Sequence, residues 1–537
     1  MRGTRISGQA GAGVLARLAL RRDRIILPAW VYVVTALVAG TAYTFRKVYT
    51  PSARVQLWTG GSRNPALEFL YGRLYGTSVG ALTAWRYGVW AAIFASVMTT
   101  TLVVRHTRAD EESGRLELIG AGVVGRRTPL TVALAVAAAA GVLLTALIVI
   151  ALAFLGLPAA GAVALAFAIT GCSLAFAGLA ALAAQLTAGA RAARGITLGV
   201  LGAAYLLRAV GDSAGTRGPA WLAWLSPLGW TEMIRPFAGD RWWVLALPVA
   251  LAGAAGIAAY LVAARRDYGA GLLPVRPGAP QGGRLLGDPL GLAWRLQRGT
   301  LAGWAAAFVF GCAAAGAAAK GIDSLVGGSS GLRNEFTRLG GQSVLTSAYL
   351  AAVMSMAGLA AGAYAVSAVL RLRSEESGGL AEPVLAGPAG RIRWALSHLA
   401  VAVAGSGVLL LTAGVAAGLG YGLRAGDAGA QVASLTGAAL AQWPAALAVA
   451  GVTVVLFGAV PRAAVAGGWS VVSATVLAVF FGPLLRFPQW LMDVSPFTHA
   501  PKLPGAAVHA APLLWLTAAA AVLAAAGLAA LRRRDIG

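Results

Sequence analysis

Apolar residues along this chain come in long runs, separated by short polar segments that are rich in arginine. A helix needs roughly 20 apolar residues to cross a hydrocarbon core about 30 Å thick. Twelve runs reach this length, six in each half of the chain. They centre near residues 25–45, 87–104, 129–155, 160–187, 196–212 and 242–264, and near 300–319, 345–370, 394–420, 431–459, 464–485 and 510–531. The pattern predicts an all-α integral membrane protein with twelve transmembrane helices.

The second half of the chain repeats landmarks of the first half in the same order. Glu-Glu-Ser-Gly occurs at 111–114 and again at 375–378. Further pairs are Gly125-Arg126 with Gly390-Arg391, Trp221-Leu222 with Trp490-Leu491, and Arg265-Arg266-Asp267 with Arg533-Arg534-Asp535. Repeats at a nearly constant spacing indicate an internal duplication. We expect one six-span domain at 1–270, a cytoplasmic linker at 271–284 and a second six-span domain at 285–537.

The orientation of the spans follows from their number and from the flanking charges. An even number of spans per half makes both halves enter the membrane in the same sense, as parallel repeats. Short arginine-rich flanks, such as Arg21-Arg22 and Arg126-Arg127, follow the positive-inside rule. We therefore expect the N- and C-termini, and both Glu-Glu-Ser-Gly segments, to lie in the cytoplasm.

Composition supports the membrane assignment and excludes other classes. Apolar residues make up 58% of the chain and charged residues 12%, whereas soluble domains carry roughly 25% charged residues. The net charge is +24, but no basic segment is interleaved with stacking aromatic residues on a soluble domain, so nucleic-acid binding is not predicted. Cys172 and Cys312 fall inside different predicted spans, and two such residues make neither a disulfide framework nor a metal site.

A polar segment lies between the second and third predicted spans of each half, at 105–127 and 371–392. In the first, residues 110–118 are expected to form a short surface helix, with acids in the first turn where the helix dipole favours them. Glu111 and Arg115 are spaced i,i+4 and are expected to form an ion pair. The alternative interpretation is that these acids are ordinary solvated loop residues.

The chain resembles type 2 ABC exporter permeases, and in particular the fused twelve-span permeases associated with export of polyketide antibiotics and other drugs in actinobacteria. The resemblance covers almost the whole chain. Its most specific parts are Glu111-Glu112-Ser113-Gly114-Arg115-Leu116-Glu117 with the repeat at 375–378, Leu206-Leu207-Arg208-Ala209-Val210-Gly211-Asp212, and Trp224-Leu225-Ser226-Pro227-Leu228-Gly229-Trp230. It implies a permease subunit in the bacterial plasma membrane that exports hydrophobic or amphipathic compounds.

The same resemblance implies a partner. In such permeases the loop after the second span of each six-span unit forms a coupling helix, which docks on a separate ATP-binding subunit. The resemblance implies two copies of an ABC ATPase, which would bind ATP and Mg, while no cofactor or metal is expected in this chain. The second segment departs from the pattern, since Gly379 follows Glu-Glu-Ser-Gly where the first has Arg115, and Pro383 and Pro388 interrupt the following helix. The coupling residues implied are Glu111, Glu112, Arg115, Glu117, Glu375, Glu376 and Glu382.

The residues indicate no catalytic site in the chain itself. None of its lysines, Lys47, Lys320 and Lys502, belongs to a Gly-x-x-x-x-Gly-Lys-Ser/Thr phosphate loop. Energy is therefore expected from another polypeptide or from an ion gradient. A gradient-driven multidrug carrier with the same layout is the alternative, although such carriers place ionisable groups deep in their spans and the predicted spans are almost bare of Asp, Glu and Lys. The histidines, His106, His398, His499 and His509, have no catalytic neighbours and are expected in loops or at interfaces.

The export pathway and the outer surface can be given candidate residues. Arg208 and Asp212 are spaced for a helical salt bridge, with a substrate contact as the alternative. Tryptophans are expected in an interfacial aromatic belt, with residues 218–230 as a short helix at the outer surface; they are Trp221, Trp224, Trp230 and Trp490. The candidates for lining a pathway between the halves are Trp90, Phe94, Met98, Tyr205, Arg208, Met354, Tyr364, Trp469 and Phe480.

Overall fold

The computed structural model describes residues 11–61, 65–120, 124–213, 219–267, 269–273, 283–319, 342–481, 488–506 and 509–535. Every regular element among them is a helix. Eleven of these helices are long and apolar enough to cross a membrane, and a shorter apolar helix starts at Ala464, where the eleventh predicted run begins. The all-α membrane fold is thus confirmed, with eleven membrane-length helices in the described part of the chain. Of the predicted linker, residues 274–282 lie outside that part.

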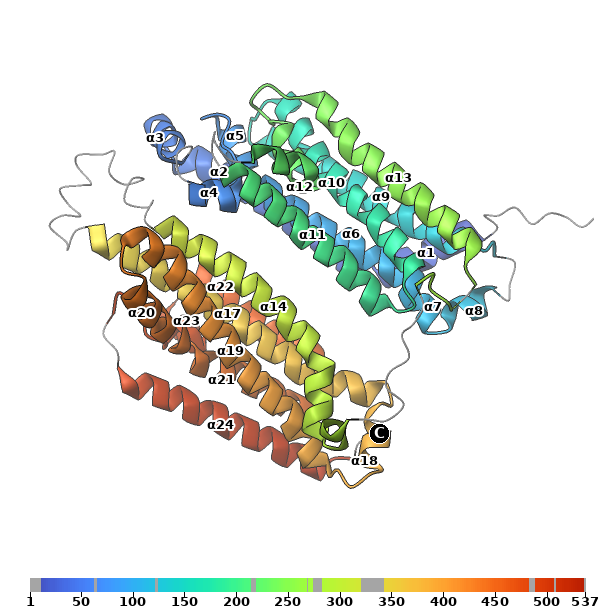
Figure 1. Ribbon diagram of the computed structural model, residues 1–537, viewed down its shortest axis with the longest axis vertical. Coiled ribbons are helices and arrows are strands. Elements are labelled where there is room, and N and C mark those ends of the chain that lie inside the picture. The colour runs from blue at the N-terminus through green and yellow to red at the C-terminus, as the bar shows by residue number, and fades with distance from the viewer. Residues whose placement is uncertain are drawn as a thin grey trace, which may run out of the picture. The chain divides into compact units, whose positions relative to one another are not determined.

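The chain divides into two compact units, Met1–Pro277 and Gly278–Gly537, each a bundle of long helices (Figure 1). The elements of unit 1 are α1 (Ala12–Arg22), α2 (Ile26–Lys47), α3 (Pro51–Gly61), α4 (Pro65–Tyr71), α5 (Val79–Thr83), η1 (Ala84–Gly88), α6 (Val89–Val104), η2 (Arg105–Ala109), α7 (Asp110–Glu112), α8 (Arg115–Gly120), α9 (Thr128–Phe154), α10 (Ala159–Leu186), α11 (Ala190–Ser213), η3 (Ala220–Leu225), α12 (Pro227–Met233), η4 (Trp242–Leu245) and α13 (Ala246–Arg265).

The elements of unit 2 are η5 (Arg284–Gly287), α14 (Pro289–Ala319), α17 (Gln342–Ser377), α18 (Ala381–Leu385), α19 (Arg391–Ala425), α20 (Ala428–Leu440), α21 (Trp443–Ala459), α22 (Ala464–Phe481), α23 (Gln489–Asp493), η6 (Pro496–Thr498) and α24 (Ala510–Arg533). The two units repeat the same helix neighbours. In unit 1, α10 packs on α6, α9 and α13, while in unit 2 the helices α20 and α21 together pack on α17, α19 and α24. The repeated packing is what an internal duplication requires.

Small residues let these helices approach closely. A Cβ added to Gly458 on α21 would lie 2.1 Å from the carbonyl oxygen of Gly527 on α24, so only glycine fits at this crossing. Close backbone approach through glycine and alanine is typical of packed membrane helices. In lipid, helices associate through van der Waals packing, because the hydrophobic effect does not drive them together. Glycines in close crossings of this kind account for part of the 71 in the chain.

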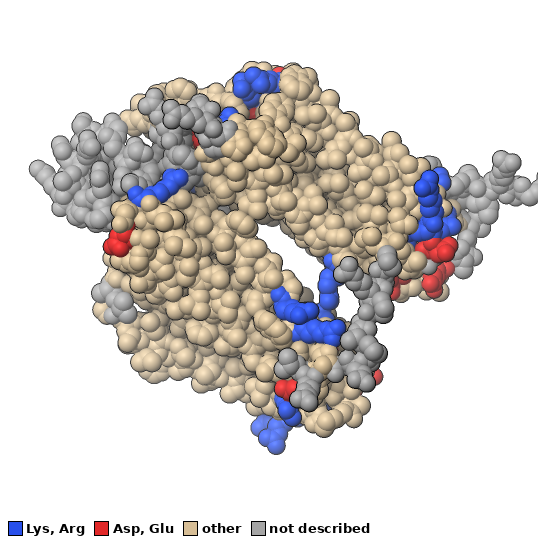
Figure 2. All heavy atoms as spheres, viewed as in Figure 1, with Lys and Arg blue, Asp and Glu red and all other residues tan. Residues whose placement is uncertain are grey.

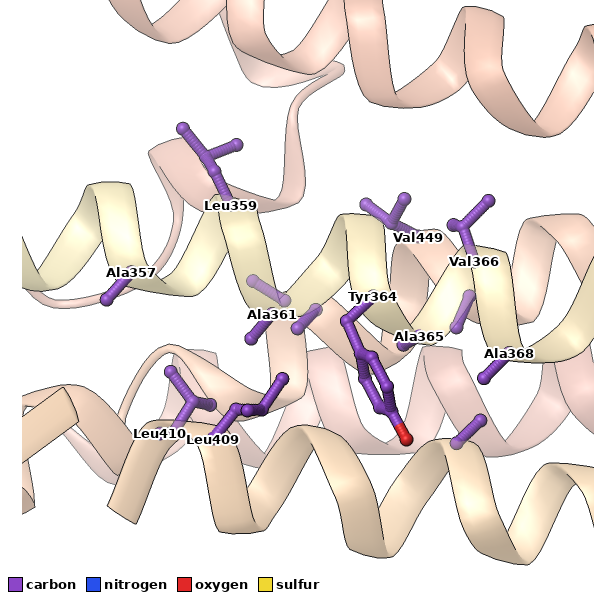
Figure 3. Close-up of a cluster of buried hydrophobic side chains, with 14 of the residues drawn as sticks. Ala357, Leu359, Ala361, Tyr364, Ala365, Val366, Ala368, Leu409, Leu410 and Val449 are labelled. Atoms are coloured by element: carbon purple, nitrogen blue, oxygen red, sulfur yellow. The ribbon is translucent and has the colours of Figure 1, made fainter. Parts of the chain in front are cut away.

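The core of unit 2 is built around α17. Figure 3 shows Tyr364 of this helix among buried alanine, leucine and valine side chains, with its ring directed toward α19. Gly405 of α19 makes room for it, since a Cβ there would lie 2.2 Å from the Tyr364 hydroxyl oxygen. Tyr364 is therefore part of the packing that joins the two helices.

Charged side chains concentrate where the helices end. In Figure 2 the charged residues drawn for unit 1 gather at the ends of its helices, and acidic side chains lie beside basic ones near α7 and α8. Charges at the ends and uncharged sides between them suit helices that cross a bilayer. The helix ends are consequently where the charged candidate sites are found.

Candidate functional site

The predicted surface helix over 110–118 is wrong, because the segment forms two short helices. α7 continues the second membrane helix, and α8 begins at Arg115. Between them Gly114 has a φ of 72°, a left-handed conformation that favours glycine and commonly ends a helix. This turn separates Arg115 from Glu111, so the predicted i,i+4 pair is also wrong. Arg115 Nη1 instead lies 3.4 Å from Asp110 Oδ1.

Glu111 is buried inside unit 1, with 4% of its side chain exposed. Its two carboxylate oxygens accept hydrogen bonds from Nη1 and Nη2 of Arg266, at 2.7 Å each. Arg108 Nη1 donates to Oε2 at 2.9 Å, and the backbone N–H of Gly269 donates to Oε1 at 2.7 Å. The Glu111 carboxylate thus holds the end of the second membrane helix to the chain that follows the sixth.

The same arrangement occurs in unit 2 around Glu376. Arg534 Nη1 and Nη2 donate to its two oxygens at 2.6 and 3.1 Å, and Arg373 Nη1 donates at 3.2 Å. Only 2% of the Glu376 side chain is exposed. Arg534 directly follows α24, as Arg266 directly follows α13. Each unit therefore fastens its second membrane helix to its last one through a buried bidentate pair.

These contacts align Glu111 with Glu376, one residue away from the alignment that the Glu-Glu-Ser-Gly repeat suggests. The backbone agrees, because Gly379 has a φ of 67° and so is the counterpart of Gly114, at 72°. The sequence alignment of Gly379 with Arg115 is therefore wrong. Leu380 stands where the first segment has Arg115.

The corrected alignment separates the candidate coupling residues into internal and exposed ones. Glu111, Glu375 and Glu376 are held inside their own units. Glu112 is exposed, and its Oε2 accepts a hydrogen bond from the backbone N–H of Ala190 at 3.0 Å, at the start of α11. The other exposed candidates are Arg115 and Glu117 in the first segment and Glu382 in the second.

Two of the histidines are buried at the same helix ends, so the expectation of loop or interface positions is wrong for them. His398 Nε2 lies 3.2 Å from Glu375 Oε2, and its Nδ1 lies 3.0 Å from Gln297 Nε2. His106 Nε2 lies 2.5 Å from Asp23 Oδ2. In unit 1, His106 near the end of the second membrane helix thus contacts a residue just before the first. In unit 2, His398 on the third membrane helix contacts residues on the first and the second.

A second charged cluster surrounds Arg208 on α11, whose side chain is completely buried. Its Nη1 lies 3.7 Å from Asp212 Oδ2 and 3.1 Å from Glu232 Oε1, and its Nη2 donates to the carbonyl of Phe69 at 2.9 Å. The helical pair predicted from the spacing is present. Glu232 is an additional partner, contributed by α12.

Local sequence places Glu232 where it can meet Arg208. The Ser226 hydroxyl accepts hydrogen bonds from the N–H groups of Leu228 and Gly229, both at 3.2 Å, and Pro227 occupies the first helical position. Serine caps and first-turn prolines both favour a helix start. The resulting α12 carries Glu232 toward α11. The single short helix predicted over 218–230 is wrong, because η3 and α12 are separate helices and α12 continues to Met233.

Arg73 completes this cluster from the loop after α4. Its backbone N–H donates to Glu232 Oε2 at 3.2 Å, and its Nε lies 3.5 Å from Asp212 Oδ1. Burial, reinforced by Asp212, raises the pKa of Glu232 well above its ordinary value. Burial also raises the pKa of Glu68 from 4.5 to about 7, against the opposing effect of Arg73.

The raised pKa of Glu68 predicts a pH dependence of stability. A carboxyl group whose pKa is higher in the folded state stabilises the fold at low pH, and this contribution is lost as the pH rises through the folded value. We therefore expect the full-length chain in detergent to lose thermal stability between pH 4.5 and about 7, and Glu68→Gln to weaken that loss. Thermal unfolding measured at steps of pH for both proteins tests this; identical profiles would contradict it.

The predicted pathway residues lie in several environments. Met98, Met354 and Tyr364 are buried in the cores of their own units, and Phe94 packs against the same core as Met98. Trp469 is an exposed residue of α22. Phe480 belongs to α22 as well, and its side chain lies outside the described residues. A lining role stays a prediction for all of them.

The remaining pathway candidates lie next to the Arg208 cluster. The rings of Trp90 and Tyr205 are 5.8 Å apart, and the Arg208 guanidinium lies 4.7 Å from the centre of the Tyr205 ring. A cation over an aromatic face is attracted by the ring quadrupole. Aromatic side chains thus connect the second membrane helix to the buried charges of the fifth.

The tryptophans near α12 and α23 are positioned for an interfacial belt. Trp221 and Trp490 are largely exposed, as is Trp243, whose ring stacks on that of Trp224 at 5.9 Å. The Trp230 indole N–H donates to the carbonyl of Trp224 at 2.7 Å. Aromatic residues of this kind favour the boundary between lipid and water. Their interfacial role stays a prediction.

The partners of the predicted acids were missed because they lie far along the chain. Arg266 and Arg534 each occur in the repeated Arg-Arg-Asp motif that closes a half, so a signal was present but had no assigned purpose. Glu232 had a weaker signal, as a lone acid in an apolar and aromatic region. Neither signal indicates which residue the arginine or the glutamate contacts.

Two similar helical units with apolar membrane-length helices, and with their charged contacts at the helix ends, indicate a multi-pass membrane protein. A family model described as "Multidrug efflux system permease Rv1217c, C-terminal domain" matches residues 286–532. The chain is 43% identical over 533 residues to the "Multidrug efflux system permease protein Rv1217c" of Mycobacterium tuberculosis, covering 99% of this chain and 96% of that protein. The chain belongs to this family of bacterial multi-pass efflux permeases, which confirms the resemblance to exporter permeases.

Proposed function

We propose that this chain is the membrane-spanning subunit of an ATP-driven exporter of hydrophobic or amphipathic drugs, coupled to two copies of a separate ATP-binding subunit. The relative's name describes a multidrug efflux system, which supports the class of cargo. The proposal assigns docking to α8 in the first unit and to α18 in the second. The chain would supply no catalytic group to ATP hydrolysis.

The observation that carries the proposal is the pair of short helices that follow the second membrane helix of each unit. Both α8 and α18 come after a left-handed glycine, Gly114 or Gly379, and both expose an acid, Glu117 or Glu382, at the same position of the corrected alignment. Leu118 on α8 is 81% exposed. A single exposed leucine is common on protein surfaces, so the matching positions of the two helices and of their acids carry the proposal.

The proposed function can be tested directly through the energy source for export. The chain has no phosphate-binding loop, so the purified chain in nanodiscs should hydrolyse no ATP. Hydrolysis should appear when it is purified together with its ATP-binding subunit, and an inactivating change in that subunit's phosphate loop should abolish drug efflux. Steady hydrolysis by the isolated chain would contradict the assignment.

The competing function is a gradient-driven carrier, favoured by the buried carboxyl groups of Asp212 and Glu232. Buried ionisable groups in a membrane protein are commonly used for proton coupling. The same cells distinguish the two functions. Efflux that continues after a protonophore collapses the proton gradient, while cellular ATP is maintained, supports the exporter; efflux that stops under these conditions supports the carrier.

A further inference from the structure

We propose that Glu111 with Arg266, and Glu376 with Arg534, are positioning residues that carry movement of the docked ATPase to the last membrane helix of each unit. This inference rests on the proposed function, because it takes α8 and α18 as the docking helices. We refer to the two bidentate pairs as the coupling pairs. They differ from docking contacts in being buried inside the permease.

The coupling pairs lie directly beside the docking helices. Only three residues, ending in Gly114, separate Glu111 from α8, and only four, including Gly379, separate Glu376 from α18. So short a connection cannot absorb a large displacement of α8 without moving the end of α7. Glu111 is in turn fixed to Arg266 by two parallel hydrogen bonds, a geometry that resists both sliding and rotation.

Each coupling pair is also connected by hydrogen bonds to the ends of further membrane helices. In unit 1, Arg266 Nε donates to Gln185 Oε1 on α10 at 2.7 Å, and Arg126, just before α9, donates to the Arg266 carbonyl. In unit 2, Arg391 at the start of α19 donates to the Arg534 carbonyl at 2.9 Å. A force applied at α8 or α18 therefore reaches the second, third and sixth helices together, and in unit 1 also the fourth.

Recurrence in both units argues that the coupling pairs do more than stabilise one loop. Around them the two segments differ: Leu380 replaces Arg115, and Ser377 replaces Glu112 at the corrected alignment. The acid and the arginine after the last helix are nevertheless present in both, with the same bidentate geometry. Two of the three exposed candidates in the first segment, Glu112 and Arg115, have no counterpart in the second, whereas the buried pairs are the same in both units.

The experiment compares docking, ATP turnover and transport in the full complex. The variants are Glu111→Gln, Arg266→Gln and the double variant, with ethidium as the transported probe. We expect the ATPase to copurify at the wild-type level and to hydrolyse ATP, while ethidium efflux falls about tenfold, within the range typical of coupling between sites. The double variant should lose no more than either single variant, because residues that act through one contact are not additive.

Matched controls and a local readout keep the result interpretable. Arg265→Gln removes the same charge from the exposed neighbouring residue and should leave efflux unchanged, whereas Arg266→Lys keeps the charge without the bidentate geometry and should lie between Gln and wild type. Hydrogen exchange at the Gly269 amide, which donates to Glu111, should become faster in Glu111→Gln. Membrane levels must match wild type.

Three results would overturn the inference: unchanged efflux in the single variants, additive losses in the double variant, or a loss of ATPase binding as large as the loss of efflux. The last result would make Glu111 a support of the docking helix only. Failure of this inference can be distinguished from failure of the proposed function. If the proposed function were wrong, the wild-type chain would neither bind an ATPase nor export ethidium by ATP hydrolysis.

Discussion

Arg208→Gln is expected to destabilise unit 1 by about 3–5 kcal/mol, the usual cost of removing one partner of a buried ion pair. The arginine is completely buried and faces the carboxyl groups of Asp212 and Glu232. It also donates to the carbonyl of Phe69 at 2.9 Å, which would keep only the longer hydrogen bond from the Tyr205 hydroxyl, at 3.5 Å. Glutamine is too short to replace these contacts. For a unit of this size the loss corresponds to a fall in Tm of about 6–20 °C.

Glu232→Gln is the informative comparison for this prediction. Since the pKa of Glu232 is raised well above its ordinary value, the neutral amide resembles the state that the buried acid favours. The amide would also retain an oxygen that accepts from Arg208. Thermal unfolding of the purified chain should therefore show a much smaller shift for Glu232→Gln than for Arg208→Gln.

Arg191→Gln is the matched control, because Arg191 is an exposed arginine on the same helix. It should leave the unfolding temperature unchanged within about 0.5 kcal/mol, as is usual for surface substitutions. An Arg208→Gln protein as stable as the Arg191→Gln protein would show that the cluster around Arg208 contributes little to the fold.

Much of the fold could be predicted because the membrane leaves a chain few choices. Long apolar runs must form helices when no water is present to satisfy the backbone, so the apolar pattern predicts the helices. The boundaries were less accurate: the second run was expected at 87–104, and the helix spans Val79–Glu112. Polar residues near its ends form ion pairs inside the unit. A search for apolar residues alone ends the helix before these residues, although their pairing lets the helix continue through them.

The candidate site was harder to predict because its contacts are distant in sequence. The pair of Arg208 with Asp212 follows from helical spacing alone and was predicted correctly. The contact of Glu111 with Arg266 joins residues that no periodicity connects. The repeated Glu-Glu-Ser-Gly letters even suggested a wrong alignment, since backbone conformation at Gly114 and Gly379, not residue identity, marks the equivalent positions.

The corrected alignment changes which residues should bind the ATPase. α8 begins with Arg115, which is 61% exposed, and carries exposed Glu117, whereas Leu380 and Glu382 occupy the corresponding places at α18. If identical ATP-binding subunits dock at both helices, the first presents the extra charge. We expect the first helix to contribute more binding free energy, because a hydrogen bond to a charged group contributes about 1.5–3 kcal/mol.

Arg115→Ala with Glu117→Ala removes two charges and should therefore weaken ATPase binding about 10- to 150-fold more than a change that removes only one, the factor that one such hydrogen bond implies, and should reduce efflux with it. Leu380→Ala with Glu382→Ala should weaken binding less, since only one charge is lost. Binding of the purified ATP-binding subunit to each full-length variant in nanodiscs measures the difference, with exposed Arg24→Ala as a control that removes a charge outside α8 and α18. Equal losses at the two helices would show that the charge at Arg115 is not used in docking, and an unaffected Kd for both double variants would remove α8 and α18 from the interface.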